Sequence, residues 1–151
     1  MTPALEFVFE LNAQLSRAAD LGPTPFGFRR IIDILSGTFE GPQLRGTLPP
    51  GGADWQIIRS DKVTELHAHY ILNTDDGALI EVNVRGLRHA PGDALERIAK
   101  GEIVDPADYY FRVTPVFQAP DGPYAWLNRS IFVGSGERMA AGVRIRVFRL
   151  L

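Results

Sequence analysis

The segment Val63–Arg85, VTELHAHYILNTDDGALIEVNVR, decides the fold because it predicts two paired strands joined by a defined turn. Its first half, Val63 to Leu72, alternates apolar and polar residues, which is the pattern of a strand with one buried face. The side chains of that face are Leu66, Ala68, Tyr70 and Leu72. Ala78 to Arg85 reads as the second strand, and the intervening Asn73–Gly77 ends in an Asp-Gly pair that favours the positive φ angles of a hairpin turn. We therefore predict an antiparallel hairpin here.

The chain before this hairpin predicts further strands separated by irregular pieces. Leu5 to Leu15 alternates apolar and polar residues, the pattern of a half-buried strand. The side chains expected on its apolar side are Leu5, Phe7, Phe9, Leu11, Ala13 and Leu15. Leu21 to Phe28, LGPTPFGF, is expected to be a loop or irregular crossing because Gly and Pro interrupt strand pairing. Arg29 to Phe39 resumes an apolar run, and the Gly-rich stretch from Gly37 to Arg59 predicts short extended pieces between tight turns.

The chain after the hairpin predicts one short helix followed by more strands. Pro91 to Lys100 is the helix, since Asp93 can cap its start and Gly101 can end it. Asp105 to Asp108 predicts a turn or a single helical loop. The last hairpin is expected to join Trp126–Val133 to Val143–Leu150 through the connection GSGERMAAG, which should lie on the surface.

Many strands, with turn signals every ten residues or so and no helix between successive pairs, predict an all-β fold with antiparallel pairing. We expect a single antiparallel β-barrel of roughly eight to ten strands, because closure removes exposed edges and leaves an interior that can hold a small ligand. A β-sandwich is the alternative. The length of 151 residues fits one domain spanning residues 1–151.

The composition excludes several classes of function. A net charge of −2 lacks the basic surplus of a nucleic-acid binder, so nucleic acid is not expected as a partner. No apolar run is long enough to span a bilayer, and the amino terminus lacks a signal-peptide pattern, so we expect a cytoplasmic protein without a membrane partner. The absence of cysteine excludes disulfides and thiolate chemistry.

Five segments, taken in order and spacing, resemble one protein family. They are GTFEGPQLRG (37–46), PGGADW (50–55), TDDGALI (74–80), YYFRVTP (109–115) and YAWLNRSIFVG (124–134). With them the chain closely resembles uncharacterised protein family 0311 (UPF0311), also called the domain of unknown function numbered 3237, over nearly its whole length. The resemblance implies a compact β-barrel and, by analogy, a small-molecule role.

The segment Tyr109–Val133, YYFRVTPVFQAPDGPYAWLNRSIFV, predicts two strands that form a binding wall. Strand alternation places Tyr110, Arg112 and Thr114 on one face of the first strand. The same alternation gives the second strand a face with Tyr124, Trp126, Asn128 and Ser130. Aromatic rings beside hydrogen-bonding groups suit a small organic ligand.

In this hypothesis Tyr110 and Trp126 stack on the ligand while Arg112 and Asn128 hold its oxygen atoms. Two structural alternatives stay open. Arg112 could instead form an ion pair with a glutamate of another strand, the candidates being Glu40, Glu65 and Glu81. Trp126 could instead be a core residue.

Asp54 and Trp55 follow two glycines that let the backbone approach other groups closely. Asp54 is the candidate catalytic residue, a general base if burial or a neighbour raises its pKa toward the working pH. Trp55 is a further candidate for ligand binding. The alternative is that Asp54 caps a turn and Trp55 plugs one end of the barrel.

Four other residues are weaker candidates. His67 and His69 share a strand face with Glu65, an arrangement that can bind a metal, but a His-x-His pair alone is a weak signal and we predict a solvated pair and no metal site. The same pair could serve in acid-base catalysis. Glu40 and Arg45 lie near turns and could line a site or form a structural pair.

The leading functional hypothesis is a cofactor-free barrel that binds a small aromatic or carboxylate-bearing metabolite, with proton-transfer chemistry of the isomerase or dehydratase type. The rivals are a carrier or sensor without turnover and a protein-assembly module. Both faces of the strand around Trp126 are apolar in sequence, so if Trp126 faces the lumen the other face must pack on another subunit or on the short helix, and a homodimer is expected.

Overall fold

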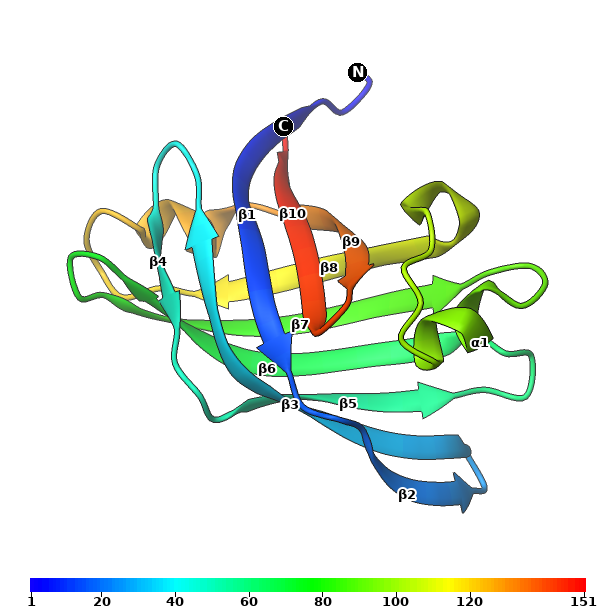
Figure 1. Ribbon diagram of the computed structural model, residues 1–151. Coiled ribbons are helices and arrows are strands. Elements are labelled where there is room, and N and C mark those ends of the chain that lie inside the picture. Colours follow the sequence, from blue (N-terminus) through cyan, green and yellow to red (C-terminus); the bar gives the residue numbers. More distant parts are fainter.

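Ten strands, one α-helix and two 3-10 segments make up the fold (Figure 1). The strands are β1 (Leu5–Leu15), β2 (Ala19–Thr24), β3 (Gly27–Glu40), β4 (Arg45–Leu48), β5 (Gly52–Ile58), β6 (Thr64–Thr74), β7 (Leu79–His89), β8 (Tyr110–Gln118), β9 (Phe132–Met139) and β10 (Gly142–Leu150). The helical segments are α1 (Ala94–Ala99), η1 (Pro106–Asp108) and η2 (Ala125–Arg129).

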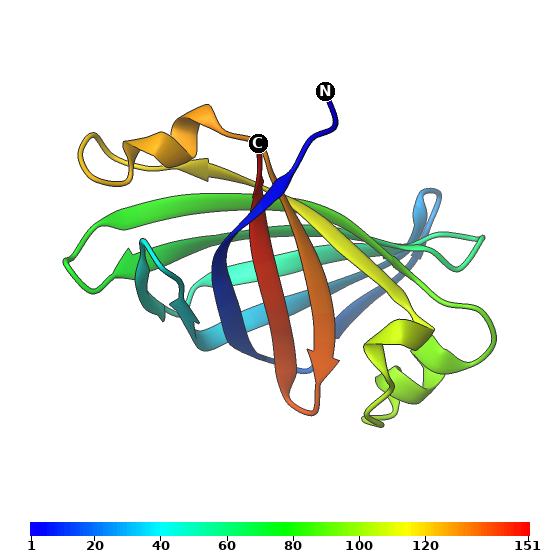
Figure 2. The ribbon, with the colours of Figure 1, turned by 90° about the horizontal axis from the view of Figure 1, so that it is seen from above.

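The sheet closes because β1 pairs with both β10 and β3. In the computed structural model, which describes residues 1–151, the hydrogen-bonded order is β1-β10-β9-β8-β7-β6-β4-β3-β2, and β5 also pairs with β3 and β6. Eight antiparallel strands thus form a closed barrel with two extra strands (Figures 1 and 2). The predicted antiparallel barrel is confirmed, and the sandwich alternative is wrong. No helix of the structure is long and apolar enough to cross a membrane.

The central hairpin is confirmed and supplies the longest continuous ladder that faces the barrel interior. β6 and β7 pair from Thr64 opposite Arg88 to Asn73 opposite Leu79. The turn is closed by a 2.9 Å hydrogen bond from the Thr74 amide to the Ala78 carbonyl, and Gly77 has φ of +88°. This ladder fixes which side chains of both strands point inward.

The strict alternation predicted for β1 fails at its start. The register against β10 shifts between Phe7 and Phe9, so that Val8 and Phe9 are both buried while Leu5 is 56% exposed. A bulge of this kind inserts one residue and moves the preceding side chains to the other face. From Phe9 onward the predicted apolar side does face inward, through Leu11 and Ala13.

The segment predicted as an irregular loop, Leu21–Phe28, is largely strand. β2 pairs with the first part of β3 in spite of Pro23. The pairing is possible because β2 is an edge strand with no partner on its other side, where a missing N–H costs nothing. A register shift between Asp20 and Gly22, with Gly22 at φ +92°, takes up the irregularity.

The last hairpin differs from the prediction at both ends of its first strand. Residues 125–129 form η2 rather than strand, and GSGERM belongs to β9 rather than to a surface loop. Gly136 explains the second difference, because a Cβ there would lie 2.6 Å from the Phe111 ring. This glycine leaves room for packing on β8 and does not mark a turn.

The connection between β7 and β8 follows the prediction in outline. α1 begins after Asp93, whose side chain makes no capping hydrogen bond, and Gly101 at φ +87° follows its end. Asp105 accepts a 2.9 Å hydrogen bond from the Ala107 amide and so caps the predicted single turn.

One part of the barrel interior is filled by aromatic rings. Phe9 lies edge-on to Phe39 and Phe117, with centroids 5.5 and 6.0 Å apart, and Phe117 also meets Phe132 at 4.9 Å. All four side chains are at most 4% exposed. The other part of the interior is not filled.

Candidate functional site

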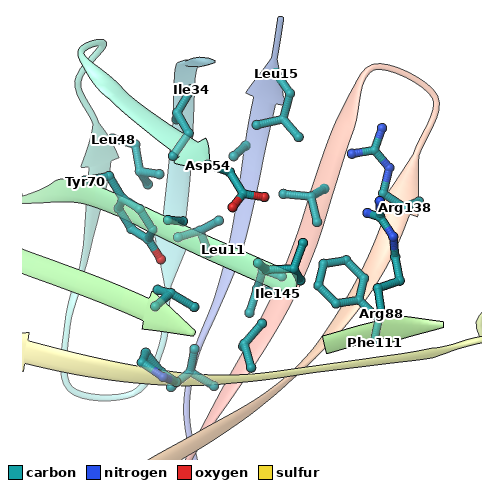
Figure 3. Close-up of a pocket in the computed structure, with 18 of the residues that line it drawn as sticks. Leu11, Leu15, Ile34, Leu48, Asp54, Tyr70, Arg88, Phe111, Arg138 and Ile145 are labelled. Atoms are coloured by element: carbon teal, nitrogen blue, oxygen red, sulfur yellow. The ribbon is translucent and has the colours of Figure 1, made fainter. Parts of the chain in front are cut away.

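The unfilled part of the interior is a cavity of about 70 Å³. Its wall is mostly aliphatic and comes from strands all round the barrel (Figure 3). The polar side chains in this wall are Asp54, Gln56, Tyr70, Arg88 and Arg138. A space of this size holds about five water molecules or a short organic molecule.

β5 brings the carboxylate into the cavity. At its start Gly52 lies so close to β6 that an added Cβ would be 2.5 Å from the Cβ of Tyr70. Strand alternation then turns Asp54 and Gln56 inward and leaves Trp55 outside, 43% exposed, with the Arg29 guanidinium 5.9 Å from its ring centre. Asp54, the candidate catalytic residue, therefore lines the barrel interior, whereas Trp55, the other candidate of this segment, lies on the outside.

A directed chain of hydrogen bonds holds the Asp54 carboxylate. Arg30 donates from Nε to Oε1 of Gln56 at 2.7 Å, and Gln56 donates from Nε2 to Oδ2 of Asp54 at 2.7 Å. The backbone N–H of His67 donates to Oδ1 at 3.0 Å. Because a guanidinium can only donate, it fixes the Gln56 amide oxygen toward Arg30 and the amide nitrogen toward Asp54. Both carboxylate oxygens are therefore held as acceptors.

Two further arginines face the cavity without a carboxylate partner. Arg88 is 5% exposed, and neither it nor Arg138 has a nitrogen within 4.0 Å of a carboxylate oxygen. The Nε atoms of both are buried without a hydrogen-bond partner. The Arg88 guanidinium lies over the Phe111 ring, 5.5 Å from its centre. Asp54 is the carboxylate of this cavity, and Arg30, Arg88 and Arg138 each interact with it electrostatically.

Burial and like charge disfavour the charged form of Arg88. Burial, reinforced by the positive charges of Arg138 and Arg30, lowers the pKa of Arg88 to about 10. Burial also raises the pKa of Asp54 above 3.8, although hydrogen bonds from Gln56 and His67 and the nearby arginines oppose the rise. The site therefore holds an excess of positive charge in apolar surroundings.

The raised pKa of Asp54 predicts a pH dependence of stability. The folded state binds the Asp54 proton more tightly than the unfolded state, so this contribution is fully present below pH 3.8 and is lost as pH rises through the folded-state pKa. We expect the melting temperature of Asp54→Asn, minus that of the wild type, to increase from acid to neutral pH. Thermal denaturation across that range measures it, with Asp33→Asn on the exposed side of β3 as the control. A difference that stays constant with pH would show that the pKa of Asp54 is unchanged by folding.

The structure does not bring Arg112, Trp126 and Asn128 together in the interior. Tyr110, Arg112 and Thr114 do share a face of β8, but it is the exposed outer face, while Phe111 and Val113 point inward. Arg112 stacks on Tyr110 at 5.2 Å and donates to the Phe111 carbonyl at 2.9 Å, so it forms none of the glutamate ion pairs considered. Tyr110 and Arg112 line an outer groove of about 660 Å³ instead.

Trp126 and Asn128 lie on η2 and have structural partners. Asn128 accepts from the Ala119 amide at 2.7 Å and donates to the Ala119 carbonyl at 2.9 Å, which fastens η2 to the end of β8. Trp126 packs against Phe132 at 6.1 Å, and the Arg149 guanidinium lies 5.7 Å from its ring centre. The predicted face with Tyr124, Trp126, Asn128 and Ser130 does not exist, because a 3-10 turn has no period of two.

The weaker candidates lie outside the barrel. His69 contacts Glu81 at 2.8 Å and His67 contacts Asn83 at 3.2 Å, both on the outer side of the central hairpin. The structure has no group of three His, Cys, Asp or Glu side chains arranged for a metal. Arg45 is opposite Glu40 in the β3–β4 ladder. Its guanidinium, however, pairs with Asp75 at 3.1 Å. Any ligand contact of these residues stays a prediction.

Sequence reasoning missed the arginines of the cavity, although a signal was present. Counting by twos along β7 from Ile80 through Val82 and Val84 reaches Arg88, and counting along β9 from Phe132 reaches Arg138. An arginine on the buried face of a strand is rare unless it is paired. The alternation of side chains along these two strands therefore places both arginines on the inward face.

The family model described as "Protein of unknown function (DUF3237)" matches residues 3–150. This chain belongs to the DUF3237 family. A UPF0311 protein from Rhodopseudomonas palustris is 42% identical to it over 153 residues, which cover 100% of both chains. The crystal structure of that protein, described as a conserved protein of unknown function, has a TM-score of 0.93, with 40% identity and coverage of 100% and 99%.

Two other solved structures extend the comparison. A "beta-barrel like protein" from Acinetobacter baumannii has a TM-score of 0.87 and 38% identity, with 100% of this DUF3237 chain and 98% of that chain covered. A structure described as an enzyme from Penicillium herquei has a TM-score of 0.75 at 20% identity, with coverage of 100% and 96%. This distant likeness shows a common fold alone.

Proposed function

We propose that this DUF3237 protein binds a small carboxylate-bearing metabolite inside its barrel, with the carboxylate at Arg88 and Arg138. One observation carries the proposal: two guanidinium groups face an apolar cavity without a carboxylate partner. Buried charges are normally paired, and an arginine left unpaired inside a fold is costly. A bound anion would supply the missing charge.

The chemistry of the wall favours a carboxylate on a carbon skeleton over a bare inorganic anion. The guanidinium presents a planar set of donors that matches a carboxylate. Most of the remaining wall is aliphatic, which suits methylene or methyl groups. Trp126 and Tyr110 lie elsewhere, so aromatic stacking no longer supports the choice of ligand. The volume of about 70 Å³ favours a short molecule.

Asp54 gives this site a means of moving a proton. Its carboxylate lines the same cavity as the two arginines, and burial raises its pKa toward the range where a carboxylate exchanges protons readily. In the proposed reaction Asp54 accepts a proton from a ligand carbon and returns it to another atom of the ligand, an isomerisation that needs no cofactor. A dehydratase would instead deliver that proton to a departing hydroxyl.

A carrier without turnover is the second candidate. It is favoured by the two hydrogen bonds that Asp54 already accepts, which stabilise the carboxylate as a fixed counter-charge. An assembly module has less support, because a protein that only packs against a partner needs no interior cavity and one is present. A homodimer stays a prediction.

A ligand screen tests binding. We expect short carboxylic acids to raise the melting temperature of the protein, while the corresponding amides do not, because only the acids carry the charge. Arg88→Met should abolish this stabilisation by acids. Arg85→Met, on the exposed outer face of the same strand, should keep it. Equal effects of acids and amides, or acid binding that survives in Arg88→Met, would refute the site.

The Asp54→Asn variant then separates enzyme from carrier. Once an acid that binds is converted by the wild type, the variant should retain binding and lose turnover. Turnover that survives unchanged would show that Asp54 is not the base.

A further inference from the structure

The phenol of Tyr70 is a polar group of the cavity that no hydrogen bond within the protein uses. Tyr70 lines the cavity, and Figure 3 shows its hydroxyl directed into it from the wall opposite Arg88 and Arg138. Tyr109 and Tyr124 both use their hydroxyls in hydrogen bonds, to the Arg138 amide and to Asp76. The Tyr70 hydroxyl is not one of the fully buried polar atoms that lack a partner, so it stays accessible within the cavity and free to bond a ligand.

We propose that Tyr70 binds a second oxygen atom of the ligand, and that the ligand is therefore a short hydroxy- or oxo-carboxylic acid. This inference rests on the proposed function, because it takes the carboxylate to be held by Arg88 and Arg138. It adds a specificity-determining residue and names the chemical class of the substrate.

The barrel geometry separates the two polar ends of the cavity. Tyr70 is opposite Val82 in the central ladder, and Arg88 follows Val82 by six residues, roughly 20 Å along the strand. Both side chains are long and shorten this gap. The wall between them is aliphatic, including Val84, Ala68 and Leu66. A ligand that reaches both ends thus needs a carboxylate, a short apolar link and a second oxygen.

The protonation state of the phenol fits this role. Burial, with a contribution from the negative charge of Asp54, raises the pKa of Tyr70 well above its normal value, so the hydroxyl keeps its proton. A neutral phenol donates to a carbonyl oxygen and can also accept from a hydroxyl. Either oxygen function of the ligand would satisfy it.

Tyr70→Phe tests the inference because it removes one oxygen and keeps the ring. The probes are three acid pairs that differ in one oxygen function: pyruvate and propionate, 3-hydroxybutyrate and butyrate, and 4-oxopentanoate and pentanoate. Calorimetry gives the affinity of each for the wild type, for Tyr70→Phe and for Tyr110→Phe as the outer-face control.

In at least one pair the wild type should prefer the oxygenated acid by about three- to tenfold, the effect of one hydrogen bond. Tyr70→Phe should lose that preference, bind the plain acid unchanged, and melt no lower than the wild type without ligand, since no internal hydrogen bond is removed. Tyr110→Phe should keep the preference. This inference would be overturned, and the proposed function left standing, by either of two results. The wild type could bind plain and oxygenated acids equally well through Arg88, or the preference for the oxygenated acid could survive in Tyr70→Phe. Binding of neither member of any pair would overturn both.

Discussion

The Arg88→Met protein should melt at a higher temperature than the wild type and should bind short carboxylic acids far more weakly. Methionine fills much of the arginine volume, and it would pack on Phe111, where the guanidinium now lies. The charge that it removes is 5% exposed and has no anionic partner. Replacing buried charges by apolar groups of similar size is often neutral or stabilises a protein by about 1–4 kcal/mol.

The pKa of Arg88 gives the sign of this effect independently. Its folded-state pKa is lowered to about 10, so the associated stability is present only at pH values above the ordinary pKa of arginine and is lost as pH falls through about 10. At neutral pH the folded protein therefore carries the full cost of the charged group. Removing the group relieves that cost, and Asp54 keeps its link to Arg30 through Gln56.

The gain in stability should raise the melting temperature by about 2–4 °C for each kcal/mol. Loss of a hydrogen bond to a charged group should weaken carboxylate binding by about 10- to 100-fold. Differential scanning calorimetry without ligand and titration with propionate measure the two effects. A variant that is both less stable and equally able to bind propionate would show that Arg88 is a structural residue.

Phe9→Ala should have the largest effect on stability of any single change considered. The ring is fully buried and touches Phe39 and Phe117, which come from β3 and β8. Its removal opens a cavity where strands from opposite sides of the barrel meet, and Phe→Ala changes of this kind cost about 3–5 kcal/mol. The β1 bulge holds Phe9 in place, so the strand cannot shift by one residue to refill the space.

Urea denaturation measures the free energy of unfolding of this variant. Phe26→Ala is the matched control, because Phe26 is 81% exposed and its loss should leave stability almost unchanged. A cost below about 1 kcal/mol for Phe9→Ala would mean that the aromatic cluster is not the main core of the barrel.

The local pattern of the chain determined the fold class and one residue of the site. The period of two in β6, with the Asp-Gly turn after it, specifies the central hairpin, because both are properties of neighbouring residues. The paired glycines before Asp54 and the alternation of β5 place this carboxylate in the interior. These features need no knowledge of distant strands.

The tertiary structure alone decided what surrounds Asp54. Arg30, Arg88 and Arg138 come from three strands far apart in the sequence, and they meet only because β1 pairs with both β3 and β10 and so closes the barrel. Trp126 and Asn128 have their structural partners close by in sequence, at Phe132 and Ala119, because residues 125–129 form η2 and not a strand. The alternation along a strand decides on which face of that strand a side chain lies. Which of these faces enclose the same cavity depends on how strands that are distant in sequence pair.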